Sequence, residues 1–153
     1  MHMKNSYALI TGASSGIGLE IAKNLAKRGY NLILTARRTE MLDSLAMEIT
    51  SENDIHVDII SKDLSKYETP KEIFEFCESK NYQIDLLVNN AGYGIKTSFH
   101  ETSIEVEEDF IRVLGTSVIM LTKLFIPKML SNGGGKIMII SSVASFAAPS
   151  AIQ

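Results

Sequence analysis

The sequence has no tryptophan, only three prolines and a single cysteine among its 153 residues. One cysteine cannot form an intramolecular disulfide, so a fold held together by disulfides is excluded. We expect Cys77 to be a reduced, partly buried thiol in a cytoplasmic protein. The chain also has no excess of basic residues, since its formal net charge is −3. A nucleic-acid partner or an anionic membrane surface is therefore not indicated.

Long apolar runs are missing as well. No uninterrupted run approaches the ~18 residues of a membrane-spanning helix, and the first residues lack the apolar region of a signal peptide. His100 has no Cys, Asp or His at ligand spacing, so we expect no metal site. With 45% hydrophobic and 22% charged residues the composition is globular, and the length predicts one domain over residues 1–153.

A glycine-rich stretch, Thr11-Gly12-Ala13-Ser14-Ser15-Gly16-Ile17-Gly18, follows an apolar run and precedes a segment of helical periodicity. It predicts a strand, a tight turn and a helix N-terminus. Gly12 lets the chain turn sharply, Gly16 admits a phosphate against bare backbone, and Gly18 lets helix and strand approach closely. The unpaired N–H groups and the positive dipole end of the helix would hold a dinucleotide pyrophosphate. A glycine-rich turn that binds nothing is the alternative.

Short apolar runs alternate with amphipathic segments along the rest of the chain. Further strands are expected near 32–34, 55–60, 86–88 and 137–140, and helices near 16–28, 39–49, 69–77 and 102–130. Thr39 is a predicted N-cap, and Thr69 with Glu72 and Thr102 with Glu105 are predicted capping boxes. The alternation predicts an α/β fold, a doubly wound parallel sheet with right-handed crossovers.

Several motifs, taken in this order, resemble the short-chain dehydrogenase/reductase family across essentially the whole chain. The stretch from Thr11 to Gly18 is similar to the cofactor turn of that family. Asp63-Leu64 resembles the pair that contacts adenine, and Asn89-Asn90-Ala91-Gly92 the segment that braces the sheet beside the cofactor. The second serine of Ser141-Ser142 resembles the catalytic serine. The resemblance implies a Rossmann-like NAD(P)-binding domain that here ends after its fifth strand.

The residues that the resemblance and the motifs together assign to cofactor binding are Gly12, Ser14, Ser15, Gly16, Ile17, Gly18, Arg37, Arg38, Asp63, Leu64, Asn90, Ala91 and Gly92. For some of these residues, a purely structural role is the plainer interpretation and stays open. Asp63 could cap a turn, and the amides of Asn89 and Asn90 could bridge loops without touching a ligand.

The end of the second strand predicts the choice of cofactor. Folds that prefer NAD carry an acidic residue there, which bonds the ribose 2′-hydroxyl. This chain has Arg37 and Arg38 instead, and guanidinium groups would favour a 2′-phosphate. We therefore expect NADP(H) to be preferred over NAD(H). A pair of solvated arginines before Thr39 is the alternative.

The resemblance implies hydride transfer between nicotinamide and a small carbonyl or alcohol, with Ser142 holding the substrate oxygen. In the family, a tyrosine is the acid/base and a lysine lowers its pKa. Both normally fall further beyond the serine than Gln153 lies beyond Ser142. Tyr67 and Lys71 have the same mutual spacing, but Tyr67 precedes its helix. Leu114 aligns with the family asparagine that supports a proton relay.

We therefore expect this chain to be the N-terminal part of a longer reading frame, inactive or partial by itself. A non-catalytic NADP(H)-binding module and an interaction fragment are the alternatives. From Val118 to Phe125 the sequence is apolar nearly all round the expected helix. This pattern predicts self-association through the helix at 113–130.

Overall fold

A five-stranded parallel sheet organises the computed structural model, which describes residues 6–142. The strands are β1 (Ser6–Thr11), β2 (Asn31–Ala36), β3 (Val57–Ser61), β4 (Gln83–Asn89) and β5 (Lys136–Ile139). Their order across the sheet is β3-β2-β1-β4-β5, and every neighbouring pair is parallel. The chain runs outward from β1 to β3 and then resumes on the other side of β1. The doubly wound α/β fold expected from the alternating pattern is confirmed.

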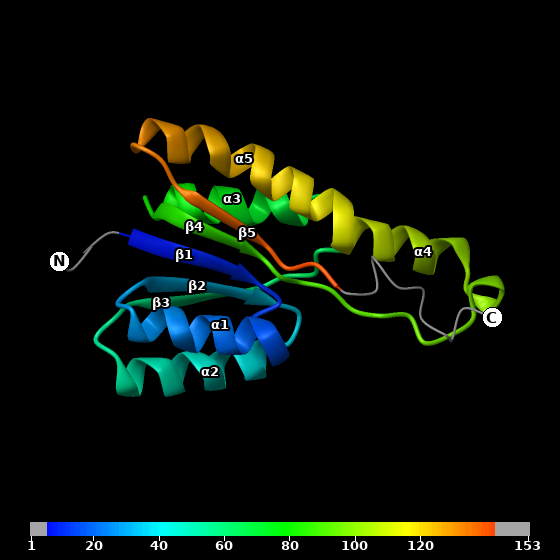
Figure 1. Cartoon of the computed structure of the whole chain (residues 1–153), viewed down its shortest axis with the longest axis horizontal. Coiled ribbons are helices and arrows are strands. Elements are labelled where there is room, and N and C mark those ends of the chain that lie inside the picture. Colours follow the sequence, from blue (N-terminus) through cyan, green and yellow to red (C-terminus); the bar gives the residue numbers. More distant parts are fainter. Residues whose placement is uncertain (1–5, 143–153) are drawn as a thin grey trace.

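Helices cover both faces of this sheet (Figure 1). They are α1 (Gly16–Lys27), α2 (Thr39–Glu52), α3 (Thr69–Ser79), α4 (Ile104–Ile111) and α5 (Ser117–Ser131), with a 3₁₀ turn at Phe99–Glu101 and a π-helical turn at Arg112–Thr116. Helices α1 and α2 lie on one face, and α3 and α5 on the other, while α4 extends past the carboxyl ends of the strands (Figure 1).

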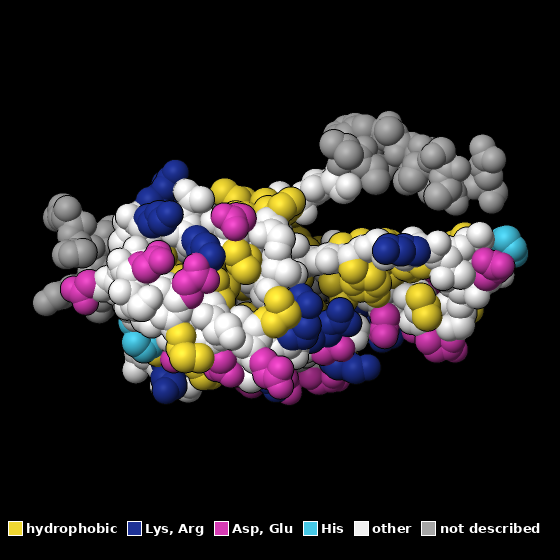
Figure 2. Space-filling view, turned by 90° about the horizontal axis from the view of Figure 1, so that it is seen from below, with side chains coloured by type: hydrophobic (Ala, Val, Ile, Leu, Met, Phe, Trp, Pro, Cys, Tyr) yellow, Lys and Arg dark blue, Asp and Glu magenta, His cyan; other side chains and the backbone are white. Residues whose placement is uncertain are grey.

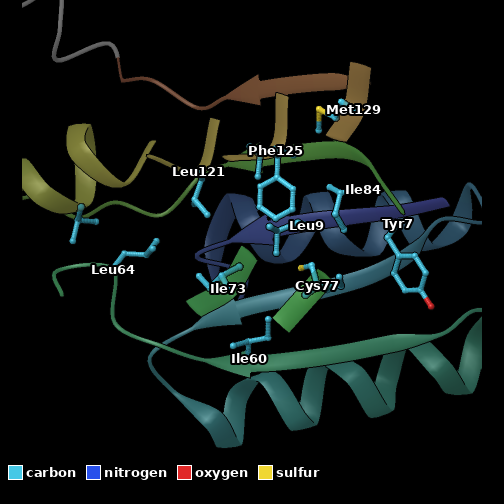
Figure 3. Close-up of a cluster of buried hydrophobic side chains, with 13 residues drawn as sticks. Tyr7, Leu9, Ile60, Leu64, Ile73, Cys77, Ile84, Leu121, Phe125 and Met129 are labelled. Carbon is cyan, nitrogen blue, oxygen red and sulfur yellow. The ribbon is translucent and has the colours of Figure 1, made fainter. Parts of the chain in front are cut away.

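The two faces of β1 explain why the middle of the strand is apolar without a break. Ala8 and Ile10 are buried under the α1–α2 layer, whereas Leu9 belongs to the opposite core beneath α3 and α5. Figure 3 shows Phe125 of α5 lying over Leu9 in that second core. Because successive side chains of a strand point to opposite faces, the middle of a central strand with both faces covered is apolar on both sides.

Cys77 lies in the same core beneath α3 and α5 (Figure 3). It is almost fully buried, more deeply than the sequence predicted. Burial raises the pKa of its thiol to about 12, so the thiolate is scarce at neutral pH.

The predicted N-caps at Thr39 and Thr69 are wrong. Helix α2 begins at Thr39 itself, and the Thr39 hydroxyl donates to Ser61 Oγ at 2.8 Å instead of serving the helix. Helix α3 begins at Thr69, whose preceding residue is already helical, with Pro70 in the first turn as expected. In both cases the helix starts earlier than a capping threonine would allow.

The predicted capping box at Thr102 is also wrong, because its hydroxyl bonds Glu107. The N-cap of α4 is the next residue, Ser103, whose side chain accepts the N–H of Val106 at 3.5 Å. The helix that follows runs through α4, the π-helical turn and α5 without a break, as the periodicity predicted.

This continuous helix, Ile104–Ser131, has 28 residues and a mean hydropathy of 1.6 in its most apolar window. By length and composition it is the one helix within residues 6–142 that could cross a membrane. Its sequence contains no uninterrupted apolar run of that length, because scattered polar residues divide the apolar stretch. A helix packed on a sheet passes the same test, and here Leu121, Phe125 and Met129 are buried in the core.

Candidate functional site

The carboxyl ends of the five parallel strands open into a cavity of about 1550 Å³. Strand order reverses between β1 and β4, and ligands of open α/β sheets bind beside such a switch point. The expected site residues that line the cavity are Gly12, Ser15, Gly16, Ile17, Arg37, Asp63, Leu64, Asn90, Ala91, Gly92 and Ser142. Ser14, Gly18 and Arg38 are not part of its wall, and each has a supporting contact instead.

The glycine turn leads from β1 into α1 and depends on three different properties of glycine. Gly12 has φ = 66°, and Gly16 has φ = 58° with open space where a Cβ would stand. A Cβ on Gly18 would lie 2.4 Å from both Gly12 O and Asn90 Nδ2. Gly18 is therefore required for the close approach of α1 to the ends of β1 and β4.

Thr11 joins the end of β1 to the end of β4, the two neighbouring strands on either side of the switch point. Its hydroxyl donates to Val88 O at 3.3 Å and accepts the N–H groups of Asn90 at 2.9 Å and Ala91 at 3.0 Å. The Asn90 amide donates back to Thr11 O at 2.9 Å and Gly12 O at 3.2 Å. These bonds fix the glycine turn against the segment that follows β4.

The two asparagines act as structural amides. Asn89 donates to Thr122 Oγ1 of α5 at 3.3 Å, while Asn90 makes the bonds just described and also lines the cavity. Asp63 likewise has two roles, since its Oδ1 accepts the N–H of Ser65 at 3.0 Å while the residue lines the cavity. All three residues therefore have the structural contacts of the plainer interpretation, and Asn90 and Asp63 also line the cavity.

The two arginines after β2 occupy different positions. Arg38 Nη2 donates to Ser14 Oγ at 3.1 Å and to Ser15 Oγ at 2.9 Å, so this guanidinium braces the glycine turn. Arg37 lines the cavity, as Asp63 does. The two arginines therefore have different surroundings: Arg37 lines the cavity, whereas Arg38 binds the serines of the turn.

Sequence inspection missed an apolar part of the wall. Tyr93, Phe110, Val113 and Leu114 all line the cavity. Leu114 belongs to the π-helical turn, and a Cβ on Gly92 would lie 2.9 Å from Leu114 Cδ2. The sequence indicated Tyr93 only by its place directly after the segment that follows β4, since side chains near a strand end often enter a binding site.

Ser142 lies at the β5 end of the cavity. The Ile140 N–H donates to Asn89 O at 2.9 Å, which continues the pairing of β5 with β4 and directs the next residues to the carboxyl edge. The residues after Ser142 lie outside the described part of the chain. Tyr67 precedes α3 and is not part of the cavity wall, which agrees with its dismissal as a catalytic tyrosine. Across residues 6–142, no group of three or more His, Cys, Asp or Glu side chains could hold a metal ion.

A parallel sheet with a glycine turn at its switch point, a helix N-terminus beside it and an arginine after β2 defines a dinucleotide-binding α/β protein. The sequence comparison gives the family. The model of the short-chain dehydrogenase family matches residues 6–152, and the chain belongs to this family.

Individual similar proteins support the same family assignment. The chain is 36% identical to a very-long-chain 3-oxoacyl-CoA reductase of Coccidioides immitis, covering 91% of this chain and 41% of the relative. A bulky-bulky ketone specific alcohol dehydrogenase from Comamonas testosteroni superposes with a TM-score of 0.88 at 31% identity, covering 97% and 58% of the two chains. A short-chain dehydrogenase from Sphingobium yanoikuyae in complex with NADPH gives 0.88 at 32% identity, covering 96% and 57%. The chain thus spans about half the length of these relatives.

The hydrogen bonds of the Thr11 hydroxyl predict that the same substitution has different effects on stability in the neighbouring strands β1 and β2. Thr11→Val should lower the free energy of unfolding by about 2 kcal/mol, because two N–H groups lose their acceptor. Thr35 pairs with Thr11 in the sheet, yet within residues 6–142 its buried hydroxyl has no hydrogen-bond partner. Thr35→Val should therefore be neutral or stabilising. Urea unfolding followed by circular dichroism measures both, and equal effects would show that the Thr11 hydroxyl bonds are not important.

Proposed function

We propose that this chain is the NADP(H)-binding part of an oxidoreductase that interconverts an alcohol and a ketone or aldehyde of a small molecule. The observation that carries the proposal is that the glycine turn, Arg37, Asp63 and Ser142 all line one cavity at the switch point. Membership of the short-chain dehydrogenase family and an NADPH-bound relative support it.

The residues present fit a dinucleotide. The side chain of Ser15 makes no capping bond to the first turn of α1, so N–H groups of that turn stay available for an anion. The space in front of Gly16 is open, which allows a phosphate to reach the backbone. We therefore assign the pyrophosphate to the N-terminus of α1.

The rest of the cofactor would extend both ways from this turn. Asp63 and Arg37 follow β3 and β2 and would hold the adenosine half, while Leu114 and Ser142 would face the nicotinamide half. The bound nicotinamide would supply or accept the hydride. Ser142 would hold the substrate oxygen by a hydrogen bond from its hydroxyl.

We also propose that NADP(H) is preferred over NAD(H). Arg37 carries this preference, because it lines the cavity, whereas Arg38 is bonded to the serines of the turn. Arg38 would act indirectly, by holding Ser14 and Ser15 in place. The single buried thiol, Cys77, favours a reducing compartment such as the cytoplasm.

Self-association through the helix at 113–130 is a further part of the proposal. One face of α5 buries Leu121, Phe125 and Met129 against the sheet. The outer side still carries large apolar residues, including Ile119 and Leu130, and exposed apolar surface of this kind favours a partner. A second copy of the chain is the partner that we propose.

Arg37→Ala should weaken NADPH binding by roughly tenfold or more and leave NADH nearly unchanged, because a charge-assisted contact contributes about 1.5–3 kcal/mol. Titration of cofactor fluorescence measures both affinities. Arg28→Ala, at the far end of α1, is the matched control and should change neither. Equal losses for NADPH and NADH in Arg37→Ala would contradict the assignment of the 2′-phosphate.

The 153-residue chain should bind NADPH without reducing ketones, aldehydes or quinones at a meaningful rate. Acid/base groups contribute about 10²–10⁴-fold, and the tyrosine and lysine expected after the serine are not among these residues. Absorbance of NADPH with a panel of such carbonyl compounds measures the rate, with Ser142→Ala as the control. Turnover that disappears in Ser142→Ala would show that an acid from elsewhere completes the site.

Ile119→Glu should shift the chain toward monomer by placing a charge on the proposed interface. Met47→Glu is the matched control, because Met47 is exposed to a similar extent (66% against 65%) but lies on α2, across the sheet. Sedimentation velocity over a range of concentrations measures the distribution. A wild-type chain that is monomeric at every concentration would contradict self-association.

A further inference from the structure

Tyr93 occupies a part of the cavity wall to which no role has yet been given. It lies three residues beyond Asn90, in the segment that connects β4 to the 3₁₀ turn. Its ring meets that of Phe110 in α4 edge-to-face, with centroids 5.5 Å apart and planes at 78°. The side chain is 40% exposed and lines the cavity. Phe110 therefore holds Tyr93 in place while part of its ring stays accessible.

The electrostatic neighbours of Tyr93 locate it along the cavity. Arg37 and Asp63 both act on its phenol, as do Asp109 and Glu107 of α4. Arg37 follows β2 and Asp63 follows β3, on the side of the sheet away from β5 and Ser142. Tyr93 thus emerges from β4 but lines the same cavity as Arg37 and Asp63, and its phenol is close enough to both charges for them to affect its pKa.

The ionisation state of the phenol suits an anionic neighbour. Burial and the negative charge of Asp109 raise the pKa of Tyr93, and Arg37 only partly opposes them. The phenol is therefore neutral at physiological pH and adds no negative charge beside bound phosphates. A neutral aromatic ring with an accessible surface is also the usual partner of a nucleobase, because every base has a π-face.

Apolar and cationic side chains lie next to one another on one face of the molecule. Figure 2 shows hydrophobic side chains gathered along the narrower end of the molecule, directly beside Lys and Arg side chains. An adenosine with a phosphate on its ribose needs both kinds of surface close together. The apolar surface takes the purine, and the cationic groups take the phosphate.

We propose that Tyr93, held by Phe110, forms the outer wall of the adenosine site and packs its ring against the purine next to Arg37. This inference rests on the proposed binding of NADP(H) and adds to it a residue that determines affinity for the adenosine half. Tyr93 is a binding residue in this role and takes no part in hydride or proton transfer.

The test compares Tyr93→Ala with Tyr93→Phe by calorimetric titration of adenosine 2′,5′-bisphosphate, NADPH and nicotinamide mononucleotide. Stacking on an aromatic side chain contributes about 1–3 kcal/mol per base, so Tyr93→Ala should weaken the bisphosphate and NADPH by a similar factor of about ten. Tyr93→Phe should retain near wild-type affinity, because the ring remains. Neither variant should change the affinity for the mononucleotide.

Tyr67→Ala is the control, because Tyr67 is 62% exposed and outside the cavity wall, and it should bind like the wild type. Urea unfolding verifies that each variant is folded. If the wild type binds the bisphosphate and Tyr93→Ala binds it equally well, the adenosine role is overturned while the proposed function stands. A Tyr93→Ala loss confined to the mononucleotide also overturns it. If the wild type binds neither NADPH nor the bisphosphate, both proposals fail.

Discussion

The segments that follow the neighbouring strands β1 and β4 leave the sheet at the switch point, and the Thr11 hydroxyl holds the starts of the two segments together. It accepts two N–H groups of the segment after β4 while donating to Val88 O within β4. Without an acceptor at this point, the backbone of that segment would be left with unpaired donors at the moment it leaves the sheet. The glycine turn on one side and the chain leading to Tyr93 on the other both start from this junction.

The same junction sets the distance of α1 from the sheet. The Asn90 amide reaches Thr11 O and Gly12 O only because Gly18 leaves room for it, since a Cβ there would lie 2.4 Å from Asn90 Nδ2. The N-terminus of α1, with its partial positive charge, is therefore held close to the strand ends. The geometry of the anion site is thus a consequence of packing between small residues.

The sequence predicted the fold well because strands and helices have different periods, and the central strands are buried on both faces. It predicted the helix starts poorly, because the hydroxyl of Thr39 has a long-range partner in Ser61. The different roles of Arg37 and Arg38 could be predicted in part from the sequence, because successive residues in an extended chain point to opposite sides. For Tyr93 the sequence offered only its place after β4, because the position of its ring depends on contact with Phe110, which is distant in sequence. The local motif therefore located the pyrophosphate site, whereas tertiary packing determined the rest of the wall.

The cavity has two chemically different ends, which the net charge of the whole chain conceals. Arg37, Lys62 and Lys66 line the end formed by β2 and β3. The other end has Val113, Leu114 and Ile139 in its wall. A formal charge of −3 argues against a broad basic surface, but local potential at a cavity depends on the few groups that face it. Leu114 also bears on the proposed reaction, because a leucine in the π-helical turn can neither donate nor accept a proton. Under the proposed function, the proton for carbonyl reduction would therefore have to come from a group other than Leu114, while Ser142, on the β5 side, would hold the substrate oxygen.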